Sequence, residues 1–206
     1  MHRPNILEPS NTKDLVAFLK PIAESAPELP FFYYHFPVLT GVDIKAYEVF
    51  ALASESIPNF AGVKFTRSDF YDMQKCLAFN GGAYNVLNGF DEMLLCGLSL
   101  GVNAAVGSTY NFMAPLYYDL WDAFIEGDLD RARTLQQYSV AVVDILVRYR
   151  GSTVAGKNIM DLIGINCRPC RLPLRDLSAN EKASLKKDLT EIGFFQRMNN
   201  YHDKNE

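Results

Sequence analysis

The chain lacks the features that mark several specialised classes of protein. Its 20 Lys and Arg residues nearly balance 24 Asp and Glu residues, and no basic cluster is interleaved with aromatic residues, so nucleic acid is not an expected partner. The longest apolar stretch, residues 93–106, is too short to span a bilayer, and the first residues lack the apolar core of a signal peptide. With no Asn-x-Ser/Thr sequon either, we expect a cytoplasmic protein without a membrane partner.

Cysteine is also scarce, since only 4 of the 206 residues are cysteines, and we expect reduced thiols rather than a disulfide scaffold. Cys167 and Cys170 form a C-x-x-C pattern in a connection rich in Pro and Arg. A zinc ribbon needs a second such pair, and a thioredoxin motif needs a strand followed by a helix. The pattern therefore indicates no metal site.

What is present is an ordinary globular composition, 49% hydrophobic and 21% charged, arranged in two parts. In residues 1–113, amphipathic helical stretches alternate with short apolar runs about four times, which is typical of strand-helix units around a parallel sheet. Residues 114–206 show helical periodicity alone. No low-complexity linker separates the two parts, so we expect one domain.

Caps and helix breakers set the expected boundaries. Asn11 and Asp43 are candidate N-caps, Pro58 ends a helix before a strand, and Ser178 with Glu181 forms a capping box. We predict helices over residues 12–26, 43–56, 68–79 and 91–100, strands over 29–35, 60–66, 83–87 and 102–106, and further helices over 114–150 with an interruption near residue 127, over 157–163 and from 178 onward.

Four parallel strands with helices between them would make half of an eight-stranded β/α barrel, a fold that usually occupies about 250 residues. Reactive groups in such folds gather where strands end, so the predicted strand ends should share one rim. Those ends are rich in polar groups and cover residues 33–37, 62–66, 88–92 and 107–111.

Lys64 carries the predicted chemistry, because it lies in the apolar run of residues 60–66, which reads as a buried strand. Burying an ammonium group is costly, and desolvation lowers a lysine pKa from about 10.4 toward neutrality. A neutral amine attacks carbonyl carbons to form a Schiff base. Alternatively, a lysine at a strand end extends its charged group to water and has no reactive role.

Neighbouring strand ends supply partners for that chemistry. The phenol of Tyr34 can move protons on a substrate hydroxyl, although a tyrosine in such a place is commonly core packing. We expect His35 to be a structural neighbour of Tyr34 rather than a base. Asp91 and Glu92 suit either helix capping or the binding of sugar hydroxyls. The other candidates for contact with the same ligand are Thr66, Gly89 and Ser108.

Together these segments resemble one family. Four segments carry the resemblance, namely the Tyr-x-x-Pro segment at residues 34–37, the Lys64 strand, Gly89-Phe90-Asp91-Glu92 and the segment 107–111. Their order and separations resemble those in the C-terminal part of N-acetylneuraminate lyases. These lyases are class I aldolases of the dihydrodipicolinate synthase superfamily. The resemblance covers essentially the whole chain. The synthase branch usually has an arginine two residues after that proline, where this chain has Leu39, so the lyase branch is favoured.

The resemblance implies a partial (β/α)8 barrel, about strands five to eight, followed by a C-terminal helical extension. It implies a homotetramer, without metal or organic cofactor, that reversibly cleaves the sialic acid N-acetylneuraminate to pyruvate and N-acetylmannosamine. Lys64 would form the Schiff base, and Tyr34 would relay the proton of the carbon-4 hydroxyl. The residues that match the family's substrate contacts are Thr66, Gly89, Asp91, Glu92 and Ser108.

The family's first four barrel strands, and its Gly-x-Thr-Gly-Glu loop that holds the substrate carboxylate, have no counterpart in this sequence. Two alternatives therefore accompany the lyase hypothesis. One is a non-catalytic fragment of the enzyme, whose open sheet edges would favour association. The other is a pyruvate-dependent aldolase of the same superfamily with a different acceptor aldehyde.

Overall fold

The computed structural model describes residues 8–202, with the side chains of residues 8–198. The chain divides into two compact units. The first consists of the residues up to Phe90 together with Cys96–Val106, and the second consists of Asp91–Leu95 together with the residues from Gly107 onward. The expectation of a single domain stays a prediction. No helix among the described residues is both long and apolar enough to cross a membrane.

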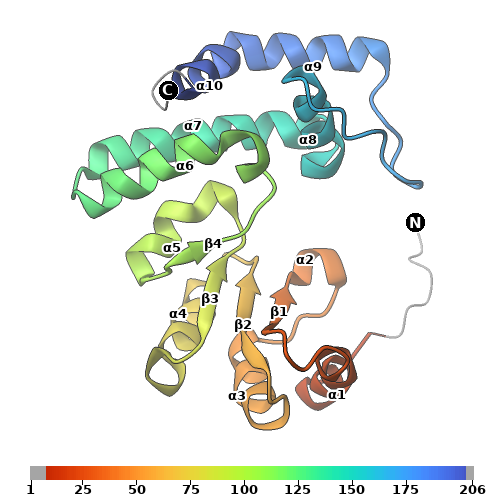
Figure 1. Cartoon of the computed structure of the whole chain (residues 1–206), viewed down its shortest axis with the longest axis vertical. Helices are drawn as coiled ribbons and strands as arrows, with labels where there is room; N and C mark the ends of the chain where they lie inside the picture. The colour runs from red at the N-terminus through yellow and green to blue at the C-terminus, as the bar shows by residue number, and fades with distance from the viewer. Residues whose placement is uncertain (1–7, 203–206) are drawn as a thin grey trace. The chain divides into compact units, whose positions relative to one another are not determined.

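The first unit is a four-stranded parallel sheet with its helices (Figure 1). The strands lie in chain order, β1-β2-β3-β4, and each neighbouring pair is parallel, as the alternating sequence pattern predicts. Helix α3 packs against β2 and α4 against β3. The elements are α1 (Thr12–Glu24), β1 (Phe31–His35), α2 (Pro37–Thr40), α3 (Ala46–Ser56), β2 (Phe60–Phe65), α4 (Phe70–Ala78), the 3-10 turn η1 (Phe79–Gly82), β3 (Asn85–Asn88), most of α5 (Leu94–Leu100) and β4 (Ala104–Ala105).

One face of this sheet is buried beneath the helices. Tyr33, Val63 and Val86 occupy the same rung of β1, β2 and β3, and all three are buried. They share a hydrophobic core with Phe50 of α3 and Met73 of α4. Because successive strand side chains point to opposite faces, the residue after each of these three faces away from that core.

Helix α3 begins at Ala46 rather than at the predicted Asp43, because its first N–H groups are capped from another helix. The carboxylate of Asp72, in α4, accepts hydrogen bonds from the backbone N–H groups of Ala46 at 2.8 Å and Tyr47 at 3.1 Å. Asp72 is buried, so these bonds form where water does not compete for the carboxylate. A cap of this kind depends on tertiary packing and has no local sequence signal.

The second unit is helical (Figure 1). Helices α6 and α7 pack against each other, and the interruption between them falls at Gly127, as predicted. Ser178 and Glu181 form both bonds of the predicted capping box. The elements are the 3-10 turn η2 (Asp91–Met93), α6 (Tyr110–Ile125), α7 (Leu129–Arg148), α8 (Gly151–Leu162), α9 (Ala179–Glu191) and α10 (Phe194–His202).

Several predicted boundaries are wrong. Helix α6 begins at Tyr110 and not at residue 114, and α8 begins at Gly151 and not at residue 157. Arg150 has a left-handed backbone with φ of 70°, which ends α7 and lets α8 start immediately. Other differences are the short helix α2 in an expected loop, the two-residue β4, and a break at residues 192–193 that makes two helices of the expected last one.

Candidate active site

Lys64 and Tyr34 lie next to each other on the sheet face that points away from the buried core. They are direct register partners on β2 and β1, and Lys64 also pairs with Leu87 on β3. The Nζ atom of Lys64 is 4.1 Å from the centroid of the Tyr34 ring. A cation over an aromatic face is attracted by the ring quadrupole, so this contact holds the lysine head at the end of the strand.

The strand that carries Lys64 is buried as predicted, but the Lys64 side chain itself is not fully buried. Phe60, Val63 and Phe65 are buried, but Lys64 is half-buried and Tyr34 is 46% exposed. The cause is the alternation of the strand, which buries only the face beneath the helices. An amine with this access can meet a substrate from solution, as a Schiff-base nucleophile must.

Thr66 and Gly89 lie at the same edge of the sheet, where the strand ladder continues into the loops. The N–H of Thr66 donates to the carbonyl of His35 at 2.8 Å, and the N–H of Gly89 donates to the carbonyl of Phe65 at 2.8 Å. A Cβ atom at position 89 would lie 2.0 Å from the Oγ1 of Thr66, so only glycine fits there. The Oγ1 of Thr66 is buried and has no hydrogen-bond partner among residues 8–198.

His35 points into the buried face and is structural, as expected. Its side chain is buried, its Nδ1 lies 3.4 Å from the hydroxyl of Tyr33, and its ring packs on Phe65. Burial, followed by the charge of Arg67, lowers the pKa of His35 from 6.5 to about 4. Burial also raises the pKa of Tyr33 to about 12, with a smaller contribution from Asp72. Both groups are therefore neutral near pH 7.

We expect the buried neutral His35 to make the protein less stable in mild acid. The unfolded chain binds a proton at His35 near pH 6.5, whereas the folded protein does so only near pH 4. The free energy of unfolding therefore has its full value above pH 6.5 and decreases as the pH falls toward 4. At pH 5 the decrease is about 2 kcal/mol. Urea unfolding at pH 7.5 and pH 5 measures this loss, and His35→Gln should remove most of it. Equal stability at the two pH values would contradict a buried neutral imidazole.

Asp91, Glu92 and Ser108 belong to the second unit, where Asp91 has a structural role. Its Oδ2 atom accepts the backbone N–H of Thr109 at 2.8 Å and the Thr109 hydroxyl at 2.6 Å. Asp91 is buried, whereas Glu92 is half-buried and Ser108 is exposed. Burial raises the pKa of Glu92 above its ordinary value, with a smaller contribution from Asp91. The bonds to Thr109 tie Asp91 to the residue that precedes α6. Helix capping at residues 91–100 and the binding of sugar hydroxyls both stay predictions for Asp91 and Glu92.

Thr109 is a residue whose importance the sequence did not reveal. Its hydroxyl also lies 2.6 Å from the hydroxyl of Tyr117, which in turn lies 2.8 Å from the Oγ of Ser139. Burial raises the pKa of Tyr117, so this chain of hydroxyl groups stays neutral. It connects Asp91 to α6 and α7. The available signal was a threonine directly before a helix that contains a tyrosine eight positions later.

The chain is similar to proteins of one family along most of its length. Residues 6–192 match the model of the Dihydrodipicolinate synthetase family. N-acetylneuraminate lyase A of Xenopus laevis is 40% identical over 177 residues, which cover 83% of this chain and 56% of the relative, and the N-acetylneuraminate lyase of Sus scrofa is 39% identical over 89% of this chain and 59% of the relative. The chain thus spans less than two thirds of the length of these curated relatives.

A solved structure supports the same relationship. The N-acetylneuraminate lyase of Proteus mirabilis superposes with a TM-score of 0.87 at 38% identity, over 93% of this chain and 64% of that one. The aligned region thus includes nearly all of the parallel sheet and helices described above. On the sequence match and the shared architecture, the chain belongs to the dihydrodipicolinate synthetase family.

Proposed function

We propose that this chain carries the Schiff-base chemistry of an N-acetylneuraminate lyase, which reversibly cleaves N-acetylneuraminate to pyruvate and N-acetylmannosamine. One observation carries the proposal. A solvent-accessible lysine lies at the end of a parallel strand, with its Nζ 4.1 Å from the ring of a tyrosine on the neighbouring strand. The relatives near 40% identity are N-acetylneuraminate lyases, which favours this substrate over others.

In the proposed reaction, the neutral amine of Lys64 attacks the keto carbon of the substrate, and loss of water gives an iminium ion. The bond between carbons 3 and 4 then breaks, and its electron pair moves into the iminium to form an enamine. Tyr34 relays the proton that leaves the carbon-4 hydroxyl, which becomes the aldehyde of N-acetylmannosamine. Protonation of the enamine and hydrolysis release pyruvate and restore Lys64. No metal or organic cofactor takes part in these steps.

Substrate contacts are proposed for the residues that match the family pattern, which are Thr66, Gly89, Asp91, Glu92 and Ser108. For Thr66, the support is a buried hydroxyl without a partner among the described residues. For Gly89, the support is that any side chain at this position would clash with Thr66. Asp91 already accepts two hydrogen bonds from Thr109, so its proposed role includes holding that loop.

The four parallel strands are proposed to correspond to about strands five to eight of a (β/α)8 barrel, with α7 to α10 as a C-terminal extension. The support is the TM-score of 0.87 together with coverage of 64% of the matched lyase. A homotetramer and a cytoplasmic location are further parts of the proposal that come from the family resemblance. Sedimentation analysis of the purified chain would test the number of subunits.

The direct test is pyruvate release. With N-acetylneuraminate as substrate, the purified chain should release pyruvate, which lactate dehydrogenase reports as loss of NADH absorbance. A 2-keto-3-deoxy sugar acid without the acetamido group should be cleaved much more slowly. The reverse order of rates would instead support another pyruvate-dependent aldolase. A folded chain that cleaves neither compound would support the non-catalytic alternative.

A further inference from the structure

A small polar cavity of about 210 Å³ lies in the second unit, between α8, the connection that follows α8, and the start of α9. Pockets for drug-sized ligands are larger, about 300–1,000 Å³, and are lined mainly by apolar groups. This cavity therefore suits a small polar ligand. Its charged lining residues are Lys157, Asp161, Arg168, Asp176 and Lys182.

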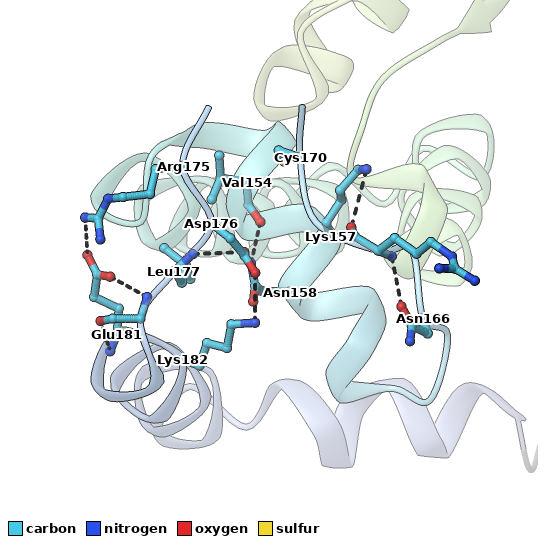
Figure 2. Close-up of polar contacts among 12 residues, drawn as sticks. Val154, Lys157, Asn158, Asn166, Cys170, Arg175, Asp176, Leu177, Glu181 and Lys182 are labelled. Carbon is cyan, nitrogen blue, oxygen red and sulfur yellow. Dashed lines mark hydrogen bonds and ion pairs between the residues drawn. The ribbon is translucent and has the colours of Figure 1, made fainter. Parts of the chain in front are cut away.

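One wall of the cavity is electrically neutral (Figure 2). The carboxylate of Asp176 accepts hydrogen bonds from the Nδ2 of Asn158 at 2.9 Å, the Nζ of Lys182 at 3.0 Å and the backbone N–H of Leu177 at 2.8 Å. The hydrogen bond from Asn158, with that from Lys182, holds the pKa of Asp176 below its ordinary value. The charges of Asp176 and Lys182 thus compensate each other. The other charged lining residues are available to interact with a ligand.

Another part of the lining carries positive charge that no carboxylate among the described residues neutralises. Lys157 donates to the backbone carbonyls of Cys167 and Arg168 at 3.3 and 3.5 Å, beyond the usual length of such bonds. Neither Lys157 nor Arg168 has a carboxylate within 4.0 Å among residues 8–198. An ammonium group has three donors, so a stronger acceptor than these two carbonyls is chemically missing.

The cavity wall is also held in shape before any ligand arrives. The backbone N–H of Arg168 donates to the Oδ1 of Asn166 at 2.9 Å, and Arg168 itself has a left-handed φ of 59°. The Nζ of Lys157, on α8, lies near two carbonyls of the same turn, at 3.3 and 3.5 Å. Preorganisation of this kind lowers the entropy lost when a ligand binds.

We propose that this cavity binds a small phosphate monoester that carries hydroxyl groups. Lys157 and Arg168 hold the phosphate, because ammonium and guanidinium groups make strong charge-assisted hydrogen bonds to phosphate oxygens. Asp161, which has no ion pair among the described residues, accepts a hydroxyl of the ligand. The site lies wholly within the second unit and does not depend on the proposed lyase reaction.

Isothermal titration calorimetry of the full chain tests the proposal. The probes are glycerol 3-phosphate and inorganic phosphate, and chloride is the background anion at constant ionic strength. Both probes should bind saturably, and the ester should bind more tightly. Arg168→Gln should weaken both by about tenfold or more, because one charge-assisted bond is lost. Asp161→Asn should weaken only the ester. Lys186→Gln, a matched exposed lysine one turn along α9 from Lys182, should change neither affinity.

Two results would overturn the proposal. One is the absence of saturable binding by both probes, and the other is unchanged binding by an Arg168→Gln protein that melts like the wild type. Arg168 is exposed, so its replacement leaves the fold intact and the comparison stays informative. Binding of inorganic phosphate without any preference for the ester would reject the role of Asp161 and the ester as ligand.

Discussion

Lys64→Arg should abolish the covalent adduct that borohydride traps from pyruvate on the wild-type chain. An imine forms only if the amine loses its proton and attacks the keto carbon, and a guanidinium stays protonated at any pH that the protein survives. The substitution keeps a positive charge above the Tyr34 ring, where Nζ now lies 4.1 Å from the centroid. The loss should therefore reflect chemistry rather than packing. Intact-mass measurement, followed by peptide mapping, reports the adduct and its position.

Lys75 offers a matched control for this experiment. Its Nζ lies 3.8 Å from the centroid of the Tyr47 ring, so it has the same kind of aromatic contact, and it is likewise half-buried. It is on helix α4, however, and not at the end of a strand. Lys75→Arg should leave the adduct intact. An adduct that persists in folded Lys64→Arg protein, or that maps to another lysine, would remove Lys64 from the proposed mechanism.

Gly62→Ala should destabilise the chain by more than about 3 kcal/mol, since it combines steric overlap with backbone strain. Gly62 lies in β2 at a register shift between β1 and β2, with φ of 154°. A Cβ atom at this position would lie 2.0 Å from the carbonyl oxygen of Asn85, its ladder partner on β3. The β2–β3 pairing would have to separate, and that would displace Lys64 two residues later. Urea unfolding gives the stability change.

Gly101→Ala separates the two causes of that loss. Gly101 also has a positive φ, 100°, but a Cβ atom there would have no heavy atom within 4 Å. Its substitution should cost only the backbone strain, about 1 kcal/mol. If the two variants lose similar stability, the close contact between β2 and β3 does not control this part of the sheet.

Local signals explain the parts of the fold that could be predicted. Alternating apolar runs and amphipathic stretches indicated a parallel sheet with helices, and the Asn11 cap and the Ser178–Glu181 capping box are both present. The pairing of Lys64 with Tyr34 followed from the rule that parallel strands end at one edge. These signals depend on residues that are close in sequence or on the strand period of two.

Other features depend on residues far apart in the chain. The side-chain amide of Asn59 donates to the carbonyls of Ala23, Ala26 and Leu29, and so satisfies the end of α1 from a position 30 to 36 residues away. The cap that Asp72 provides for α3 is of the same kind. No pattern within a single helix can predict such partners, because a buried N–H can donate to, and a buried carbonyl can accept from, any suitable group that packing brings close.

By itself, the sequence determined the parallel α/β architecture, the family, and the lysine and tyrosine proposed for the chemistry, because spacing and residue type encode these locally. Only the tertiary structure decided that Lys64 is half-buried rather than buried, that Asp91 is bound to Thr109, and that Lys157 faces a polar cavity. Burial and hydrogen-bond partners depend on which surfaces meet in space. A linear pattern states which side chains are available, and packing decides which of their charges and donors are satisfied.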